Sequence, residues 1–377
     1  MHYFISAGEA SGDLHASELM LELRKADPEA RFTFLGGDLM TVAAGCAPVI
    51  HYRQMAFMGF SEVLRNLRTI LGNLKEAKRA LAASGSDCLI LVDYPSFNLK
   101  LAKYADRLGI PVYYYISPKV WAWKEWRVKQ LRRYVRRLLS ILPFEVGYFA
   151  GKGMEVDYVG NPSLEEVDRR LAGAPDRNVF LKNHTLDSRP VLALVPGSRR
   201  GEIRNNLPVM EAVASRHPHM QAVIAGAPGI ERELYSRYSS LPVLDDSTLE
   251  IMRHAEAALV TSGTATLECA LAGTPQVVCY RANGSRLSYN IMKHLIKAPF
   301  VSLPNLITDR EVIPEMLLHM CTPDSVDYRL TDILSGSPGR ERQLQGYREM
   351  RSKLGRNMAA PTAASIITKD LTTLKSK

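Results

Sequence analysis

The sequence predicts an α/β protein built from two doubly wound parallel sheets in Rossmann-like domains. The chain has 377 residues, 46% of them apolar and 23% charged, so it is too long for one ordinary hydrophobic core and too apolar to be disordered. Short apolar runs of strand length alternate with amphipathic stretches, which is the pattern of parallel sheets covered on both faces by helices. The alternation is interrupted once, over residues 160–190, which are polar and rich in turn formers.

Nine apolar runs mark the expected strands, five before residue 160 and four after residue 190. Each half therefore has enough strands for a sheet of its own. The runs are YFIS (3–6), FTFLG (32–36), CLILV (88–92), VYYYI (112–116), LSIL (139–142), VLALV (191–195), QAVIA (221–225), AALVT (257–261) and QVVCY (276–280).

The domain boundaries follow from these runs. We expect a first domain over residues 1–165 and a second over residues 175–340. Residues 341–377 have helical character, but their periodicity does not assign them to either domain. Two doubly wound sheets in tandem place the carboxyl ends of their strands along a shared crevice, and ligands of open α/β sheets bind there. The functional residues are therefore expected in the loops that lead from strands to helices.

Charge and cysteine content narrow the partners and the compartment. The 48 Lys and Arg residues exceed the 39 Asp and Glu residues, and the net charge of +9 favours anionic partners. Basic side chains concentrate at residues 124–137. No apolar run is long enough to cross a membrane, and the first residues lack the pattern of a secretory signal. Five scattered cysteines without a CxxC pair suit buried thiols in a reducing compartment, so we expect a cytoplasmic protein.

Residues 7–13, AGEASGD, follow the first strand and precede an amphipathic helix. Gly12 permits a ligand to approach the backbone, and the helix N-terminus beside Ser11 offers free N–H groups to a phosphate or sugar oxygen. Glu9 and Asp13 bring carboxylates to the same loop. The alternative is a tight turn in which Ser11 or Asp13 caps the helix. The chain has neither GxGxxG nor GxxxxGK[ST], so a dinucleotide fingerprint and a P-loop are unsupported.

Asp93 directly follows the run CLILV, at the strand end where parallel sheets carry their chemistry. A carboxylate there can act as a general base or can cap the next segment, and its spacing favours neither role. Asn98 is a candidate hydrogen-bond partner for a substrate, or a turn asparagine. Asp93 is the first candidate for the catalytic base, with Glu9 and Asp13 in reserve on the neighbouring loop.

PGSR (196–199) is the first of two loops that suit a phosphate. It follows a strand, and Gly197 and Ser198 allow a phosphate to meet the backbone. Arg199 can bind the same phosphate through two N–H groups. An ordinary surface loop with solvated arginines is the alternative.

TSGTATLE (261–268) is the second such loop. It places Ser262 and Gly263 ahead of a short helix that Thr264 can cap. The N-terminus of that helix suits a diphosphate, and Glu268, one turn further on, can accept both hydroxyls of a ribose. A surface glutamate without a ligand is the alternative for Glu268.

All three tryptophans of the chain precede the basic segment. Aromatic side chains beside cations suit a membrane interface, a sugar platform or single-stranded nucleic acid. Residues 55–74 place apolar side chains near helical spacing and could receive acyl chains, whereas core packing is the alternative in both places. The candidate membrane or lipid contacts are Trp121, Trp123, Trp126, Met58 and Phe60.

Ten short motifs occur in order from residue 7 to about residue 307: AGEASGD, MGFSEVL, VDYPSFN, SPKVWAW, LPFE, GNP, PGSR, TSGTATLE, CYR and SLPNLI. This ordered set resembles the lipid-A-disaccharide synthase family and covers most of the chain. The resemblance implies the GT-B fold, in which two Rossmann-like domains face each other across a cleft. It also implies an inverting transfer of 2,3-diacylglucosamine from UDP to the 6-hydroxyl of 2,3-diacylglucosamine 1-phosphate, which gives the β-1,6-linked precursor of lipid A.

With the resemblance, the second domain is expected to hold UDP. Arg199 and the backbone of residues 262–264 would bind the diphosphate, and Glu268 the ribose. The resemblance adds Arg281, of CYR, and Asn305, of SLPNLI, to the UDP-binding residues. It also implies that the C-terminal helices return to the first domain and that the chain is a monomer or a homodimer.

Two positions depart from the resemblance. Ser96 stands where the family often has a second acid, and Lys119 stands where it often has a serine. Asp93 must therefore act without a neighbouring carboxylate at residue 96.

No cofactor and no metal are expected, because the UDP-sugar is a substrate and the chain lacks the DxD pair that binds a divalent ion in many other glycosyltransferases. The expected partners are lipid-linked sugars and the anionic inner-membrane surface, to which the protein would bind peripherally. Nucleic acid is not expected, because no nucleic-acid-binding motif occurs.

Two competing functions remain at this point. Another UDP-sugar enzyme of the same form, such as a 2-epimerase or a peptidoglycan-type transferase, would have a similar nucleotide site. A basic protein that docks on nucleic acid or membrane without catalysis would explain residues 117–137, but it would leave PGSR and TSGTATLE without a purpose.

Overall fold

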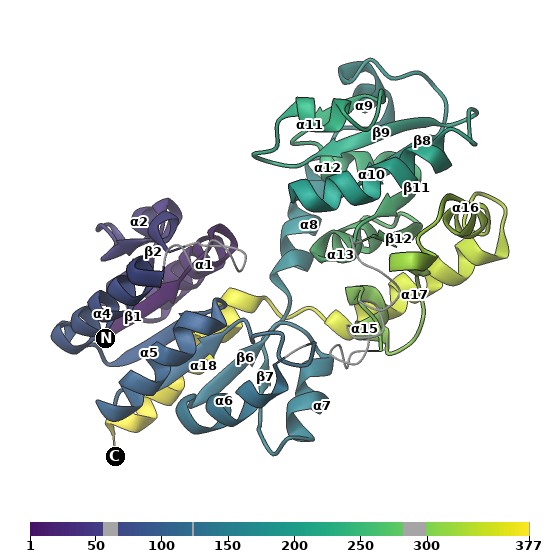
Figure 1. Cartoon of the computed structure of the whole chain (residues 1–377). Helices are drawn as coiled ribbons and strands as arrows, with labels where there is room; N and C mark the ends of the chain where they lie inside the picture. The colour runs from purple at the N-terminus through teal and green to yellow at the C-terminus, as the bar shows by residue number, and fades with distance from the viewer. Residues whose placement is uncertain (56–66, 123, 282–298, 377) are drawn as a thin grey trace. The chain divides into compact units, whose positions relative to one another are not determined.

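The computed structural model describes residues 1–55, 67–122, 124–281 and 299–376. The chain forms two compact units. The first comprises Met1–Pro162 and Arg356–Lys377, and the second comprises Ser163–Gly355. Each unit contains one fully parallel sheet between helices (Figure 1), so the predicted class of two doubly wound parallel sheets is confirmed.

The first sheet consists of β1 (His2–Ala7), β2 (Arg31–Gly36), β3 (Ile50–His51), β4 (Cys88–Val92), β5 (Val112–Tyr115), β6 (Arg137–Ser140) and β7 (Asp157–Tyr158). Its strand order is β3-β2-β1-β4-β5-β6-β7. The chain runs outward from β1 to β3 and then returns to place β4 beside β1, so the order reverses between β1 and β4. Open α/β sheets bind ligands at such a switch point, outside the carboxyl ends of the strands.

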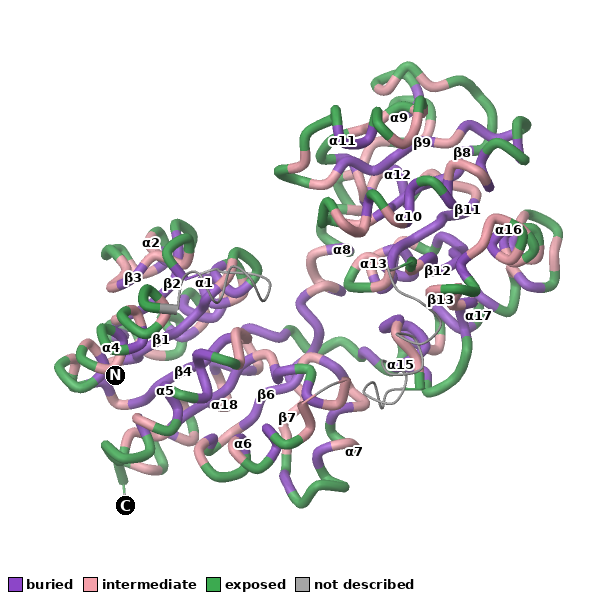
Figure 2. The backbone as a smooth tube through the Cα atoms, viewed as in Figure 1, coloured by how far each residue is buried: buried purple, intermediate pink, exposed green. Residues whose placement is uncertain are grey.

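The helices of the first unit are α1 (Ala10–Ala26), α2 (Asp38–Ala44), α4 (Leu67–Ser84), α5 (Pro95–Arg107), α6 (Val128–Tyr134), α7 (Phe144–Ala150) and α18 (Ala359–Lys375). Two hydrophobic cores attach them to the sheet, because successive side chains of a strand point to opposite faces. Tyr3 and Ile5 of β1 pack in the core that includes α1 and α18, whereas Phe4 packs in the core that includes α4 and α5. The central strands are accordingly buried along their length (Figure 2).

The second sheet consists of β8 (Val191–Val195), β9 (Gln221–Gly226), β10 (Val243–Asp245), β11 (Ala255–Val260), β12 (Gln276–Tyr280) and β13 (Glu315–Leu317). Its order is β10-β9-β8-β11-β12-β13, so the second switch point lies between β8 and β11. The helices are α8 (Pro162–Ala172), α9 (Arg177–Asn183), α10 (Arg200–Ala214), α11 (Arg232–Ser236), α12 (Thr248–His254), α13 (Thr264–Leu271), α15 (Leu303–Thr308), α16 (Pro323–Thr331) and α17 (Pro338–Leu354).

Every expected strand is present, and the differences lie in short elements. The run expected at 139–142 pairs two residues earlier, as β6, because its last two residues turn away toward α7. The structure adds β3, β7, β10 and β13, which have two or three residues each. Strands this short show no alternation, so a sequence pattern cannot reveal them.

The C-terminal helices divide between the units. The expectation that residues 341–377 return to the first domain is wrong for α17, which belongs to the second unit. Tertiary hydrogen bonds hold it there: the Gln343 amide donates to the carbonyl of Gln276 at 3.1 Å, and the Tyr347 hydroxyl donates to the carbonyl of Thr274 at 3.1 Å. The return to the first unit begins at Arg356, and α18 packs there against α1.

Candidate active site

The loops singled out in the sequence lie at the two switch points. In the first sheet Ala7 of β1 pairs with Val92 of β4, so AGEASGD and the loop of Asp93 begin side by side. In the second sheet Val195 of β8 pairs with Val260 of β11, so PGSR and TSGT also begin side by side. Strand pairing therefore assembles each pair of loops from distant parts of the chain.

The loop of Asp93 has a backbone that its neighbours hold in place. Asp93 and Tyr94 have φ of 44° and 48°, in the left-handed region that residues other than glycine rarely occupy. The carbonyl of Asp93 accepts hydrogen bonds from Asn98 Nδ2 at 2.7 Å and from the Tyr114 hydroxyl at 2.6 Å. Asn98 is fully buried, and its Oδ1 accepts from the Ser6 hydroxyl at 2.7 Å. The structure thus uses the Asn98 amide internally, to position Asp93, and leaves none of it exposed for the substrate contact expected from the sequence.

The carboxyl of Asp93 lies in surroundings that change its acidity. Burial raises its pKa, and nearby Lys119 and His15 offset part of that rise. A raised pKa strengthens a carboxylate as a proton acceptor. An acid at residue 96 would have given this loop a second carboxylate. The residue there is Ser96, whose hydroxyl accepts a hydrogen bond from Arg127 at 2.8 Å. In the described part of this loop, Asp93 therefore has no neighbouring carboxylate at residue 96, and Lys119 lies near it.

The two reserve carboxylates have different surroundings. Asp13 is buried, and its oxygens accept backbone hydrogen bonds from Gly37 at 2.7 Å, Leu39 at 3.1 Å and Met40 at 3.2 Å. It therefore caps the N-terminus of α2, a helix other than its own, which is a structural use of this carboxylate. Glu9 precedes α1. Burial raises the pKa of the Tyr94 hydroxyl, and the nearby Glu9 carboxylate adds to that rise, so Glu9 lies close to the Asp93 loop.

Gly12 and Ser11 also differ from each other. Gly12 is buried, and a Cβ there would lie 3.3 Å from the Cβ of Ala7, so this glycine lets α1 pack closely on the end of β1. Ser11 is exposed in the first turn of α1. Of this pair, only Ser11 presents a side chain to a ligand.

A buried carboxyl that the sequence reasoning missed lies after β6. Glu145, of LPFE, is 1% exposed, and burial raises its pKa to about 7. It accepts a hydrogen bond from the indole N–H of Trp121 at 2.8 Å and another from the Ser140 hydroxyl. An acid in an apolar motif directly after a strand was the signal for this residue. Glu145 therefore holds the Trp121 side chain in place.

The candidate membrane residues fall into three groups. Trp121 is half-buried, bonded to Glu145, and packed edge-on against Phe144, so it is part of the structure of its loop. Trp126 is 59% exposed. Trp123, Met58 and Phe60 lie outside the described residues.

A pocket of about 380 Å³ opens at the second switch point. The ends of β8, β9 and β11 and the starts of α10 and α13 form its walls. Six of the residues expected to bind UDP line it together: Ser198, Arg199, Ser262, Gly263, Thr264 and Glu268.

The PGSR side of this pocket is a tight turn. Gly197 has φ of 121°, and a Cβ there would lie 2.5 Å from Glu202 Oε2. That oxygen accepts backbone hydrogen bonds from Ser198 at 3.1 Å and Arg199 at 3.3 Å. The Arg199 side chain is 69% exposed and lies 3.4 Å from the same carboxylate, so its guanidinium is accessible.

The TSGT side of the pocket is the open start of a helix. Gly263, with φ of 141°, occupies the N-cap of α13, and no side chain from the described residues caps this end. The Ser262 hydroxyl donates to the carbonyl of Val301 at 3.2 Å. Burial raises the pKa of the Glu268 carboxyl, and nearby Arg170 offsets part of the rise.

Two residues expected to bind UDP do not line this pocket. Asn305 is fully buried, and its Oδ1 accepts from the backbone N–H groups of Val312 at 2.7 Å and Ile313 at 2.9 Å. Its Nδ2 donates to Glu315 at 2.9 Å, so the whole amide serves the local fold. Arg281 is exposed, and its backbone N–H donates to Asn206.

Asn206 is a second residue that the sequence reasoning missed. It is fully buried on α10 and bonds to the ends of three strands. Its Nδ2 donates to the Pro196 carbonyl at 3.1 Å and to Thr261 Oγ1 at 2.9 Å, and its Oδ1 accepts from the Arg281 N–H at 2.7 Å. A polar residue on the apolar face of an amphipathic helix was the available signal. Asn206 ties together the loops that form the pocket.

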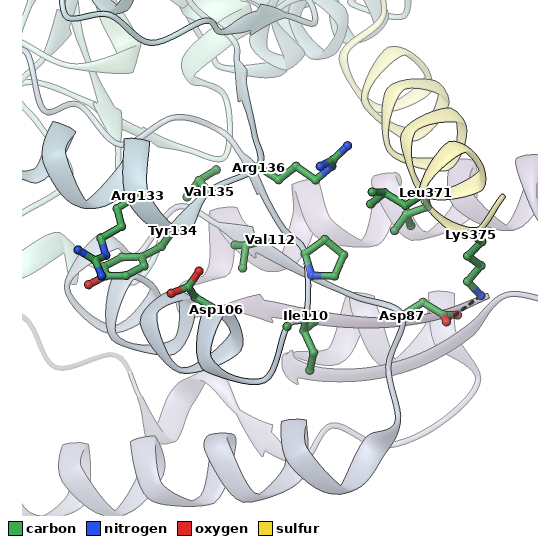
Figure 3. A pocket seen from close by; sticks show the side chains of 13 residues that line it. Asp87, Asp106, Ile110, Val112, Arg133, Tyr134, Val135, Arg136, Leu371 and Lys375 are labelled. Carbon is green, nitrogen blue, oxygen red and sulfur yellow. Dashed lines mark ion pairs between the residues drawn. The ribbon is translucent and has the colours of Figure 1, made fainter. Parts of the chain in front are cut away.

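A second hollow, of about 600 Å³, lies at the opposite edge of the first sheet, where β4, β5 and β6 begin (Figure 3). Of the five charged residues that line it, Asp87, Arg136 and Lys375 form ion pairs within the protein. Lys375 lies 2.7 Å from Asp87, and Arg136 lies 2.6 Å from Asp370. This hollow lies where the strands begin, whereas the switch point lies at their carboxyl ends.

Neither a metal centre nor a membrane span is evident in the described parts of the chain. No group of three or more His, Cys, Asp or Glu side chains there could hold a metal ion. None of the helices with described residues is long and apolar enough to cross a bilayer. All five cysteines are free. Cys46, in the loop after α2, is exposed, so the expectation of buried thiols is wrong for this residue.

The sequence matches a known family over almost its whole length. A family model described as lipid-A-disaccharide synthetase matches residues 3–367. The chain is 40% identical over 375 residues to a lipid-A-disaccharide synthase of Myxococcus xanthus, with 96% of each protein covered. It is 37% identical over 361 residues to one of Nitrosococcus oceani, with 93% of this chain and 92% of that protein covered.

Solved structures show the same architecture at low sequence identity. The UDP-GlcNAc 2-epimerase from Neisseria meningitidis bound to UDP-GlcNAc has a TM-score of 0.62 at 12% identity, covering 99% of this chain and all of that one. The calicheamicin glycosyltransferase CalG4 has a TM-score of 0.60 at 16% identity, covering 99% and 98%. At these identities the likeness establishes the fold, which is of the GT-B type.

Proposed function

We infer that this chain, which belongs to the lipid-A-disaccharide synthetase family and is a glycosyltransferase, joins two acylated glucosamine units to make the lipid A disaccharide. The donor is UDP-2,3-diacylglucosamine, and the acceptor is 2,3-diacylglucosamine 1-phosphate. The proposed roles of individual residues depend on the two switch points. One holds a carboxylate of raised pKa, and the other holds an open helix start, an arginine and a second carboxylate around one pocket.

The pocket of the second unit supports UDP binding. The start of α13 would bind the diphosphate through backbone N–H groups, and the helix dipole favours negative charge there. Arg199 would bind the same diphosphate through its exposed guanidinium. Glu268, one turn into α13 and on the same wall, would accept the two ribose hydroxyls.

The loop after β4 supports the chemical step. Asp93 would accept the proton of the acceptor 6-hydroxyl while that oxygen attacks C1 of the donor sugar. The bond from C1 to the diphosphate oxygen breaks, and UDP leaves with the electron pair. Attack on the face opposite to the leaving group inverts the configuration at C1. Arg199 and the start of α13 would stabilise the charge that develops on UDP.

The product decides between this reaction and an epimerase with a similar nucleotide site. Thin-layer analysis should show a disaccharide monophosphate and UDP when both substrates are supplied, and no disaccharide when the acceptor is omitted. Conversion of the donor alone to a sugar epimer would contradict the proposal. The sequence relatives favour the transferase, because those at 34–40% identity are named lipid-A-disaccharide synthase.

We propose that the reaction needs no divalent ion. The positive end of α13 and the Arg199 guanidinium would take the place of a cation at the diphosphate. Turnover should therefore be unchanged after treatment with EDTA and removal of the chelate. Activity lost with EDTA and restored by magnesium or manganese would disprove this independence.

We propose peripheral binding to an anionic membrane surface, since the lipid substrates carry acyl chains. Trp126 is 59% exposed, and Lys129, Arg132 and Arg133 are exposed on the following helix α6. Each basic side chain near an anionic surface contributes about 1 kcal/mol, so binding should weaken as salt rises.

Flotation with vesicles that contain anionic lipid tests this surface. A variant that combines Trp126→Ala with neutral replacements of Lys129, Arg132 and Arg133 should bind the vesicles less than wild type at low salt. The control is Tyr328→Ala, because Tyr328 is an aromatic of the other unit that is 73% exposed and lies beside Arg329. An unchanged fraction on the vesicles for the Trp126 variant would exclude this surface.

A further inference from the structure

Glu202 lies in the first turn of α10 and bonds back to the loop before that helix, within the proposed nucleotide pocket. Its Oε2 accepts the backbone N–H groups of Ser198 and Arg199, at 3.1 Å and 3.3 Å. Arg199 is the N-cap of α10 and Ser198 precedes it, so these N–H groups belong to the loop that leads into the helix. The Glu202 carboxylate packs against Gly197, where even one added methyl group would collide. Glu202 also lines the pocket. A fixed negative charge therefore lies beside the loop that leads into this helix.

The other helix start in the same pocket is open. Gly263 has no side chain to cap α13, and among the described residues no hydrogen-bond partner is present for the backbone N–H groups of Thr264 and Ala265. Among the described residues, the pocket thus contains one helix start with a carboxylate bonded to the loop before it and one without such a carboxylate. Like charges repel, so a diphosphate is directed to α13 and away from α10.

Arg199 is linked to Glu202 loosely enough to move. The guanidinium lies 3.4 Å from Glu202 Oε1, and its side chain is 69% exposed. An exposed ion pair of this length contributes little free energy. The backbone of Arg199 is nevertheless held by Glu202, so the origin of the side chain stays fixed while its guanidinium can turn to a phosphate.

We propose that Glu202 is a positioning residue for the donor nucleotide, which holds the Ser198–Arg199 backbone and assigns the diphosphate to Arg199 and the start of α13. This inference rests on the proposed binding of UDP in the pocket. Glu202 itself would touch neither UDP nor the reacting atoms. Its effect would pass through Arg199.

Calorimetric titration with UDP tests this role directly. Glu202→Ala should weaken UDP binding about tenfold, which is the lower end of what a charge-assisted hydrogen bond contributes. The KM for the donor should rise with it, while kcat at saturating donor stays near that of wild type. Glu202→Gln keeps an oxygen acceptor for the two N–H groups and should restore most of the affinity.

Replacement of another helix-capping residue in the second unit shows whether a general loss of stability, by itself, weakens UDP binding. Asp176 caps α9 by accepting the N–H of Val179 at 3.0 Å, and it lies outside the pocket. Asp176→Ala should lower the melting temperature as Glu202→Ala does, yet bind UDP as wild type does.

A double variant tests whether Glu202 acts through Arg199. In the Arg199→Ala background, replacing Glu202 by alanine should weaken UDP binding no further, because the side chain that Glu202 positions is gone. Additive losses, an unchanged affinity in Glu202→Ala, or tighter binding of UDP would each overturn the inference. A wild-type protein that does not bind UDP would instead overturn the proposed function, so the two failures are distinguishable.

Discussion

Replacing Asp93 by asparagine is expected to lower kcat about 100- to 10,000-fold, the usual effect of removing a general base. The asparagine keeps the shape of the side chain but cannot accept the proton of the acceptor hydroxyl. UDP affinity should stay close to wild type, because the residues proposed to hold the nucleotide belong to the other unit. Steady-state kinetics and UDP titration on the same preparation measure both quantities.

The pH dependence of turnover provides an independent check on Asp93. Burial raises the pKa of this carboxyl, and a base must be ionised to act. The acidic limb of the rate profile should therefore fall at a pH above the ordinary range of an aspartate, and the limb should be absent from the residual activity of Asp93→Asn. Activity should be lost as pH falls through the raised pKa and regained above it.

Asp106→Asn is the matched control for Asp93→Asn. Asp106 is exposed near the far end of α5, the helix that begins directly after the Asp93 loop. The control should retain wild-type turnover. If Asp93→Asn keeps more than about a tenth of wild-type turnover, well outside the range for a general base, the base is elsewhere, and Glu9 is the next residue to replace. An unfolded Asp93→Asn protein would show that the carboxylate caps its own loop.

Arg199→Ala and Glu268→Ala are each expected to weaken UDP binding by about 1.5–3 kcal/mol, roughly 10- to 150-fold, because each removes a charged hydrogen-bond partner of the nucleotide. The contacts are to different parts of UDP. Arg199→Ala should therefore also weaken pyrophosphate binding, whereas Glu268→Ala should not. Isothermal titration with UDP and with pyrophosphate separates the two roles.

Arg200→Ala is the control for Arg199→Ala. Arg200 is the next residue along the chain and is also exposed, but it pairs with Glu231 and does not line the pocket. The UDP affinity of Arg200→Ala should match that of wild type. Unchanged UDP affinity in both Arg199→Ala and Glu268→Ala would remove this pocket as the nucleotide site.

The assignment of α17 and α18 to different units could not be predicted from sequence patterns. Both segments have helical periodicity, but the unit that each joins depends on distant partners. Gln343 and Tyr347 find hydrogen bonds beside β12, whereas the alanine-rich face of α18 packs against α1. Periodicity reports which face of a helix is apolar and carries no information about the surface that the face will cover.

The buried polar residues show the same limit at the candidate site. Asp13, Asn98 and Asn305 were expected to meet a substrate, and their side chains are instead occupied by backbone groups of the protein. Glu145 and Asn206 were not expected at all, yet they bond to loops around the two switch points. A polar side chain next to a strand end has the same appearance in sequence whether it serves a ligand or its own fold.

The sequence by itself determined the class of fold, the nine longer strands, the glycine- and carboxylate-bearing loops that follow them and the family. It could do so because strands buried on both faces are continuous apolar runs, and loops that approach a phosphate need glycine next to charged residues. Only the tertiary structure decided which loops meet, which unit holds each C-terminal helix and which polar groups are free for a ligand. Those outcomes depend on strand order and on hydrogen-bond partners from far along the chain, such as the backbone of Gly37 that occupies Asp13.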